Sequence, residues 1–323
     1  MLRRVVHGCA WMFATSCAGP QSALAPAGRD AHAIAVLLAW MAGGSLLIWL
    51  GVMGAAVYAT RAERTRERAT AKRFIVLGGV VLPTGTLTVL LIFGLSMMPD
   101  LLAAGPAGAP RVAVSAERYW WRLTYDTPHG PVETANELRL PVGQRTTLRL
   151  TSPDVVHSFW VPSLAGKVDT IPGRETHLAI EPTRLGTFRG TCAEYCGGAH
   201  AQMAFTVVVQ RPEEHAAWIA AQARAAEPPQ VAVARRGAEV FASHGCGACH
   251  TVRGTGADGT VGPDLTHVGG RRRVAGILPN DVDGFARFVR DPEAVKPEAE
   301  MPGFALLSDD ELTALAHYLD ALE

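Results

Sequence analysis

Two long apolar runs place the first constraint on the fold. Residues 33–59 and 74–98 are almost wholly apolar, and each exceeds the roughly 20 residues that a helix needs to cross a bilayer. The segment between them, residues 60–73, carries six basic and two acidic side chains. Short basic loops of this kind stay on the cytoplasmic side. The runs therefore predict a transmembrane hairpin, with the N-terminus and everything after the second helix outside the cytoplasm.

The first residues show the features of an export signal. Residues 1–16 combine Arg3 and Arg4 with a short apolar run and small residues, as signal peptides do. The sequence A-T-S-C that ends at Cys17 is similar to the lipobox of bacterial lipoproteins. We expect cleavage and lipidation at Cys17, followed by a separate N-terminal segment, residues 17–32. An ordinary signal peptide or an uncleaved tail is the alternative.

A cluster of soft ligands lies in residues 191–203, T-C-A-E-Y-C-G-G-A-H-A-Q-M. Thiolate, imidazole and thioether groups in one loop favour copper over magnesium or calcium. Two coppers would need a second imidazole, and the strand-like sequence V-V-H-S-F-W-V-P supplies His157. A disulfide, a zinc site and a mononuclear blue-copper site are the alternatives. The candidate side chains are Cys192, Cys196, His200, Met203 and His157.

Residues 111–212 carry the pattern of a β-sandwich. Short apolar–polar segments with turns every 8 to 12 residues are typical of that fold. The sequence E-L-R-L-P-V-G-Q-R-T-T-L-R-L predicts a hairpin around its Pro-Val-Gly-Gln turn. The small and proline-rich segment before it, residues 99–110, is a predicted linker.

The C-terminal part carries a haem-attachment motif. S-H-G-C-G-A-C-H contains C-x-x-C-H, so Cys246 and Cys249 are predicted to form thioethers with haem c and His250 to bind its iron. With V-G-P-D-L and M-P-G-F downstream, residues 231–323 resemble class I cytochromes c. That resemblance makes Met301 the distal ligand, and methionine opposite histidine raises the potential relative to two histidines. His244 and His267 are competing distal ligands.

The copper motif has a more specific resemblance. C-x-E-x-C-x3-H-x2-M, with V-x-H-S-F-x-V-P upstream, resembles the binuclear CuA centre of cytochrome c oxidase subunit II. The resemblance extends through residues 162–174 and, loosely, over residues 33–212. It implies a cupredoxin Greek key whose metal loop joins the last two strands. The implied roles are Cys192 and Cys196 as bridges, His157 and His200 as ligands of one copper each, Met203 as an axial ligand, and Glu194 as a backbone-carbonyl ligand whose carboxylate holds magnesium beside subunit I.

Two segments differ from this family's pattern. Tyr119, Trp120 and Trp121 occupy the place of an aromatic run that admits electrons from soluble cytochrome c, with Tyr119 where the family has tryptophan. A core or membrane-interface patch is the alternative for these residues. In the second apolar run, Val76 replaces a glutamate that opens a proton pathway in the family, and Gly79 replaces a tryptophan.

The predicted fold class is a multidomain membrane protein with a two-helix transmembrane hairpin, an all-β cupredoxin Greek-key sandwich and an all-α cytochrome c domain. A linker, residues 213–230, separates the last two domains, and its first part is a predicted short helix. The cytochrome domain carries a net charge of −5 and the sandwich one of +2. Opposite charges predict docking of the two domains that weakens with salt, and ordinary surface solvation is the alternative.

The resemblance implies the subunit through which electrons enter a bacterial haem-copper cytochrome c oxidase, an oxygen-reducing and proton-translocating complex. Electrons would pass from a periplasmic donor to haem c, then to CuA and then to subunit I. The chain would lie beside other oxidase subunits in the inner membrane and would hold no oxygen-reducing site itself. A CuA subunit of a nitric oxide reductase and a membrane-tethered electron or copper carrier are the alternatives. The balanced charge, 30 basic and 30 acidic side chains, favours no nucleic-acid partner.

Overall fold

The computed structural model describes residues 18–61, 68–128 and 130–323. The predicted signal peptide and Cys17 lie outside these residues, so their processing stays a prediction. The chain forms two compact units. One is the helical unit, residues 33–103. The other is formed by the residues before position 33 together with residues 104–323.

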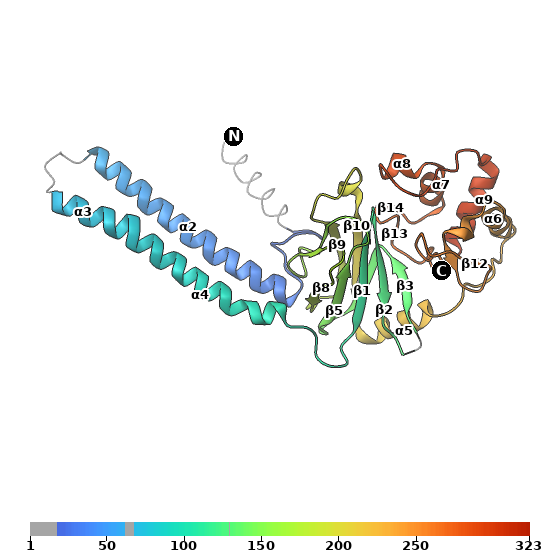
Figure 1. Ribbon diagram of the computed structural model, residues 1–323, viewed down its shortest axis with the longest axis horizontal. Helices are drawn as coiled ribbons and strands as arrows, with labels where there is room; N and C mark the ends of the chain where they lie inside the picture. The colour runs from blue at the N-terminus through green and yellow to red at the C-terminus, as the bar shows by residue number, and fades with distance from the viewer. Residues whose placement is uncertain (1–17, 62–67, 129) are drawn as a thin grey trace, which may run out of the picture. The chain divides into compact units, whose positions relative to one another are not determined.

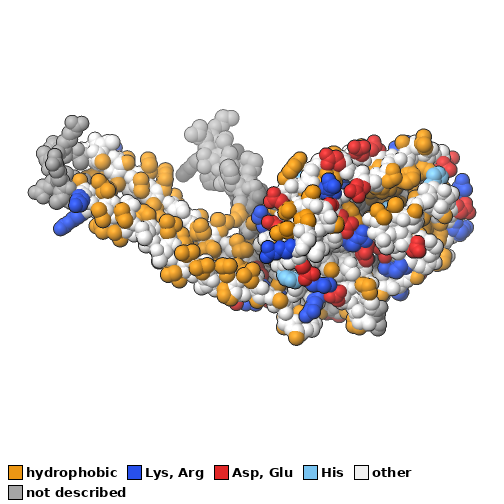
Figure 2. All heavy atoms as spheres, in the orientation of Figure 1, with side chains coloured by type: hydrophobic (Ala, Val, Ile, Leu, Met, Phe, Trp, Pro, Cys, Tyr) orange, Lys and Arg blue, Asp and Glu red, His pale blue; other side chains and the backbone are white. Residues whose placement is uncertain are grey.

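The helical unit consists of two long apolar helices that run in opposite directions (Figure 1). Helix α2 spans Arg29–Arg61, while α3 (Arg68–Val76), a π-helical turn (Leu77–Val81) and α4 (Leu82–Leu102) form the other. Both are long and apolar enough to cross a membrane, and Figure 2 shows mostly hydrophobic side chains along them. The π-helical turn directly precedes Pro83, whose ring nitrogen cannot donate to the preceding turn.

The second unit contains a β-sandwich of two five-stranded sheets, which we call the sandwich domain. Their strand orders are β3-β2-β1-β5-β8 and β4-β10-β9-β6-β7. Buried and partly exposed residues alternate along β1 and β2, as expected where one face of a sheet covers the core. The first sheet contains β1 (Arg111–Glu117), β2 (Trp120–Tyr125), β3 (Val132–Ala135), β5 (Thr146–Thr151) and β8 (Thr176–Ile180); the second contains β4 (Glu137–Pro141), β6 (His157–Trp160), β7 (Val168–Thr170), β9 (Gly186–Cys192) and β10 (Ala204–Gln210).

The predicted hairpin around the Pro-Val-Gly-Gln turn is wrong. Strands β4 and β5 follow each other in the sequence but belong to different sheets. β4 pairs in parallel with β10, and β5 pairs in parallel with β1 and antiparallel with β8. The alternation of apolar residues determines which face of each strand is buried, but it does not determine the partner strand.

Residues ahead of α2 pack on the sandwich domain. The Ala27 amide donates to the carbonyl of Ser163 at 2.7 Å. Asp30, in the first turn of α2, forms a buried ion pair with Arg145 at 3.1 Å. These contacts attach the start of the first long helix to the sandwich domain.

The C-terminal domain, which begins at α6, is mainly helical. Helices α6 and α9 cross so closely at Gly237 that no side chain fits there, because a Cβ would lie 2.0 Å from the carbonyl oxygen of Ala314. The rings of Phe241 and Tyr318 meet edge to face beside this crossing, with centroids 5.6 Å apart. Its helices are α6 (Ala232–Ser243), α7 (Val282–Arg290), α8 (Pro292–Val295) and α9 (Asp309–Asp320), and α5 (Pro212–Gln222) precedes them. With the hairpin and the sandwich, this domain confirms the predicted fold class.

Candidate metal centres

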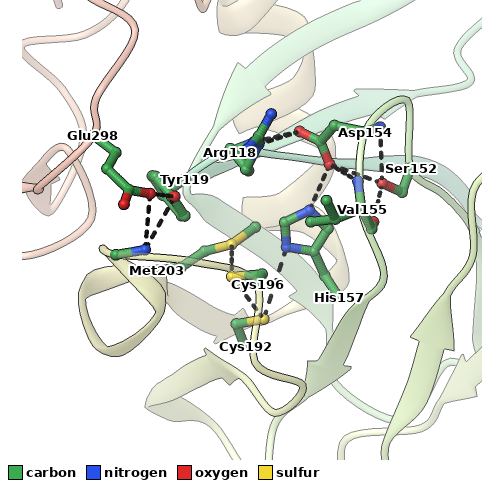
Figure 3. A network of polar contacts seen from close by, with 11 residues as sticks. Arg118, Tyr119, Ser152, Asp154, Val155, His157, Cys192, Cys196, Met203 and Glu298 are labelled. Carbon is green, nitrogen blue, oxygen red and sulfur yellow. Dashed lines mark hydrogen bonds and ion pairs between the residues drawn. The ribbon is translucent and has the colours of Figure 1, made fainter.

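The predicted copper ligands meet at one end of the sandwich domain. Four of them lie on the loop from Cys192, the last residue of β9, to Met203, directly before β10, and His157 opens β6. Figure 3 shows the sulfur atoms of Cys192, Cys196 and Met203 beside the ring of His157. The Sγ atoms of Cys192 and Cys196 are 3.8 Å apart. The remaining separations are 3.9 Å from Cys192 Sγ to His157 Nδ1, 3.6 Å from Cys196 Sγ to His200 Nδ1, and 3.8 Å from Cys196 Sγ to Met203 Sδ.

This donor set fits copper ions. A metal–thiolate bond measures about 2.3 Å, so two sulfur atoms 3.8 Å apart can both bind the same ion. Soft sulfur with imidazole nitrogen suits copper, and His157, Cys192 and Cys196 form a buried group able to hold a metal. The carbonyl oxygen of Glu194 lies 3.2 Å from Cys192 Sγ, while the Glu194 side chain is exposed.

Asp154 orients His157 and was not foreseen from the sequence. Its Oδ1 lies 2.8 Å from Nε2 of His157, so a proton on Nε2 leaves Nδ1 free to face the cysteines. The carboxylate also accepts hydrogen bonds from the amides of Val155 at 2.5 Å and Arg118 at 2.8 Å. A carboxylate on the second nitrogen of a ligand histidine is a common support of metal sites. The sequence signal that could have indicated this role is the position of Asp154, three residues before His157.

Without metal, the two thiols together hold one negative charge. The hydrogen bond from Cys196, opposed by burial and aided by His157, lowers the pKa of Cys192 to about 3. The same interaction raises the pKa of Cys196, because a second thiolate would lie beside the first. Burial lowers the pKa of His157, but its contacts with Cys192 and Asp154 outweigh burial and raise it overall. Because metals bind thiolates, copper binding here would release the proton that Cys196 keeps.

We expect Asp154→Ala to weaken copper binding about 10- to 100-fold, the usual effect of losing such a support. His157 would lose the contact that keeps Nδ1 directed at the thiolates. Competition of the full chain against a copper chelator measures the affinity. Asp169→Ala, an exposed carboxylate on the neighbouring strand β7, is the control. Equal affinities in the two variants would show that Asp154 does not support the copper ligands.

The haem-attachment motif ends in a histidine whose ring is held by a backbone carbonyl. Cys246 and Cys249 are free thiols; Cys246 begins a short 3-10 turn and Cys249 directly follows it. Nδ1 of His250 lies 2.8 Å from the carbonyl oxygen of Pro263, which leaves Nε2 for an iron ion. Burial lowers the pKa of His250 and so favours the neutral ligand form. A Cβ on Gly262 would lie 2.4 Å from the imidazole, so glycine there leaves space for the ring.

The structure distinguishes among the three distal-ligand candidates. Met301 is half-buried against the core of the C-terminal domain. Both ring nitrogens of His267 already face backbone carbonyl oxygens, of Glu323 at 2.7 Å and Arg224 at 3.1 Å. His244 is exposed, and its Nδ1 lies 3.1 Å from the carbonyl oxygen of Val240. Met301 packs against the domain core, whereas both nitrogens of His267 and Nδ1 of His244 face other oxygen atoms, so Met301 stays the predicted distal ligand.

The aromatic run lies between the copper loop and the C-terminal domain. Trp121 is fully buried, and its Nε1 donates to the carbonyl of Met203 at 3.4 Å. Trp120 is half-buried beneath the guanidinium of Arg122, 4.6 Å from its ring centroid. Tyr119 is buried, and its hydroxyl donates to the carboxylate of Glu298.

Several contacts between the sandwich and C-terminal domains are hydrogen bonds from a charged side chain of one domain to a backbone group of the other. Arg122 donates to the carbonyl of Thr260 at 3.0 Å, and Glu137 accepts from the amide of Arg272 at 2.6 Å. The ammonium of Lys296 donates to the carbonyl of Tyr119 at 2.8 Å. No local motif indicated these pairs, because their partners lie more than a hundred residues apart.

Lys296 should make the stability of the chain depend on pH. Burial lowers its pKa from 10.5 to about 7, so between these values the folded chain binds fewer protons than the unfolded chain. The free energy of unfolding should therefore rise from pH 7 to about pH 10, with the destabilisation complete below pH 7. Thermal denaturation of the full chain in detergent across this range measures it.

Lys296→Met should remove most of this rise, because methionine keeps the apolar stem and has no titrating group. Lys167→Met, at an exposed lysine of the sandwich domain, should leave the rise intact. The same slope in wild type and Lys296→Met would assign the pH dependence to another group.

Comparison with known families agrees with this geometry. Residues 124–211 match the family described as cytochrome c oxidase subunit II, periplasmic domain, and residues 234–323 match cytochrome c. Fold and site thus define a membrane-anchored protein with a copper-binding sandwich and a haem-binding domain. Over residues 124–211 the chain is similar to cytochrome c oxidase subunit II, and residues 234–323 form a cytochrome c domain at its C-terminus. These two domains imply CuA copper and haem.

Individual relatives carry the same family name. Cytochrome c oxidase subunit 2 of Alkalihalophilus pseudofirmus is 35% identical over 66% of this chain and 61% of the relative. The Bacillus subtilis protein of that name is 33% identical over 66% and 62%. The matches thus span less than two thirds of these relatives. The crystal structure of the periplasmic domain of cytochrome oxidase subunit II of Bradyrhizobium japonicum is 25% identical and covers 38% of this chain and 96% of that one, with a TM-score of 0.35.

Proposed function

We propose that this chain is the subunit through which electrons enter a bacterial haem-copper cytochrome c oxidase. The observation that carries the proposal is the meeting of five soft copper ligands in one cluster in a chain that also holds a C-x-x-C-H motif. Bound copper and haem would supply reversible one-electron chemistry. The chain's own residues position these groups and connect them, and oxygen is reduced in subunit I.

The residue roles follow the ligand geometry. Cys192 and Cys196 would hold both coppers, His157 and His200 would bind one each, and Met203 and the Glu194 carbonyl would complete the set. In the cytochrome domain Cys246 and Cys249 attach the haem, with His250 and Met301 on its iron. The exposed carboxylate of Glu194 is available for magnesium at the contact with subunit I. Tyr119 lies at the domain contact, Trp120 beside Arg122, and Trp121 in the sandwich core next to the copper loop.

The membrane arrangement follows from the two apolar helices. They anchor the chain in the inner membrane and place the sandwich and cytochrome domains in the periplasm. There a periplasmic donor meets the haem, and a membrane-embedded oxidase core with its other subunits receives the electrons. Val76 leaves the second helix without a proton-carrying side chain at that position, so proton uptake by the complex uses other groups.

Purification of the membrane complex with this chain tests the function. The expected preparation contains two coppers and one covalently bound haem in this chain, contains a further copper in the partner core, and consumes oxygen with reduced cytochrome c as donor. Consumption of nitric oxide by a core with non-haem iron would assign the chain to a nitric oxide reductase. A chain that purifies without a large membrane partner would be a tethered carrier.

A further inference from the structure

We propose that Glu298 is a positioning residue that holds the distal-ligand segment of the cytochrome domain on the copper loop. This contact gives the copper centre a fixed internal donor and closes Tyr119 to external proteins. The inference rests on the proposed function, because it concerns the route of electrons between the two centres. It assigns a role to a residue outside both ligand sets.

The carboxylate of Glu298 joins the two centres through two hydrogen bonds. It accepts a hydrogen bond from the amide of Gly198 at 2.9 Å and another from the hydroxyl of Tyr119. Gly198 lies midway between Cys196 and His200, and Glu298 lies three residues before Met301. Figure 3 shows Glu298 reaching toward Tyr119 beside the copper ligands. One side chain thus connects the backbone segments that carry ligands of both metals.

The copper loop is shaped to receive this carboxylate. A Cβ on Gly198 would lie 2.8 Å from Cδ of Glu298, and one on Gly197 would lie 2.3 Å from Oη of Tyr119. Both distances are shorter than side-chain packing allows, so the two adjacent glycines permit the approach. A Cβ at Gly198 would displace the Glu298 carboxylate, and one at Gly197 would displace the Tyr119 hydroxyl.

The backbone of Glu298 adds an independent observation. Its φ is +62°, a left-handed conformation that is uncommon for residues other than glycine, asparagine and aspartate. Such conformations persist where surrounding contacts hold them, and they cluster at functional sites. The two hydrogen bonds of the carboxylate are contacts of this kind.

Lys296 of the cytochrome domain contacts the backbone of Tyr119. Its ammonium donates to the Tyr119 carbonyl at 2.8 Å, while Glu298 accepts from the hydroxyl of the same residue. With both polar ends held by the cytochrome domain, Tyr119 keeps only 3% of its surface exposed. An external donor therefore cannot contact Tyr119 while the domains are docked, and its electrons enter through the haem.

Glu298→Gly in the full copper- and haem-loaded chain tests the inference, since glycine accepts the positive φ while the whole side chain, including the carboxylate, is removed. We expect haem-to-copper electron transfer after flash reduction to slow about tenfold or more, as the docked fraction falls with the loss of two charge-assisted hydrogen bonds. Hydrogen exchange at the Gly198 amide should rise in both the loaded and the metal-free chain. The absorption spectra and midpoint potentials of both centres should stay unchanged.

Further variants isolate the carboxylate. Glu298→Gln keeps an oxygen acceptor and should show a smaller change, and Tyr119→Phe should raise Gly198 exchange without altering residue 298. Glu300→Gly, an exposed glutamate in the same loop, is the control and should behave as wild type.

Two outcomes would overturn the inference. One is wild-type transfer and unchanged Gly198 exchange in Glu298→Gly. The other is an equal effect of Glu300→Gly, which would assign the result to loop flexibility. Failure of the proposed function is distinguishable from both, because wild type would then lack the two coppers, the haem or any transfer between them.

Discussion

Replacing Cys196 with serine is expected to abolish the mixed-valence copper–thiolate absorption of the loaded chain and to leave its haem spectrum intact. Cys196 Sγ lies within 3.8 Å of ligand atoms on Cys192, His200 and Met203, so it is central to the cluster. A serine hydroxyl is a hard and weakly acidic group that does not replace a thiolate on copper. Copper content should fall from two ions per chain to one at most, measured by elemental analysis beside visible and electron paramagnetic resonance spectra.

The reciprocal variant is the matched control for this prediction. Cys249→Ser removes an exposed thiol of the haem-attachment motif and should disturb the haem spectrum while both coppers remain. A valence-delocalised copper pair that survives in Cys196→Ser would show that this residue is not a bridge. Loss of both spectra in either variant would show instead that the two domains depend on each other for folding.

The copper ligands could be predicted because local spacing largely determines where they meet. Cys192, Cys196, His200 and Met203 share one loop between neighbouring strands, so only His157 had to be brought from elsewhere, and β6 pairs directly with β9. The predicted pairing of β4 with β5 was wrong because the alternation of apolar residues determines which face of a strand is buried but not which sheet the strand joins. The role of Asp154 depends on a side-chain contact that no motif included.

The domain contact was foreseen only in outline. Net charges predicted docking of an acidic cytochrome domain on a basic sandwich, but some of the described contacts carry the opposite signs. Glu133 and Glu137 of the sandwich meet amides of Asp264 and Arg272, and Arg272 belongs to a basic run of the cytochrome domain. Net charge averages over whole surfaces, whereas a contact depends on the few groups that it desolvates. The predicted weakening of docking by salt remains to be measured.

Met301→Ala should keep the haem attached but lower its potential and open the iron to carbon monoxide. Cys246, Cys249 and His250 would still hold the haem, while the weak thioether ligand that favours the reduced iron would be gone. A fall on the order of 100 mV is expected, within the roughly 0.8 V range that axial ligands span. Redox titration and the carbon monoxide difference spectrum of the full chain measure both effects.

The structure limits what could replace Met301. His267 would have to break the contacts of its ring nitrogens with the carbonyls of Arg224 and Glu323, and His244 is exposed and bonded to its own helix. Leu306→Ala, at a fully exposed residue five positions further along, should leave the potential and the carbon monoxide spectrum unchanged. An unaltered potential in Met301→Ala would mean that another side chain binds the iron. Because Glu298 lies on the same segment, slower transfer to copper in Met301→Ala with normal Gly198 exchange would separate the effect of the ligand from that of docking.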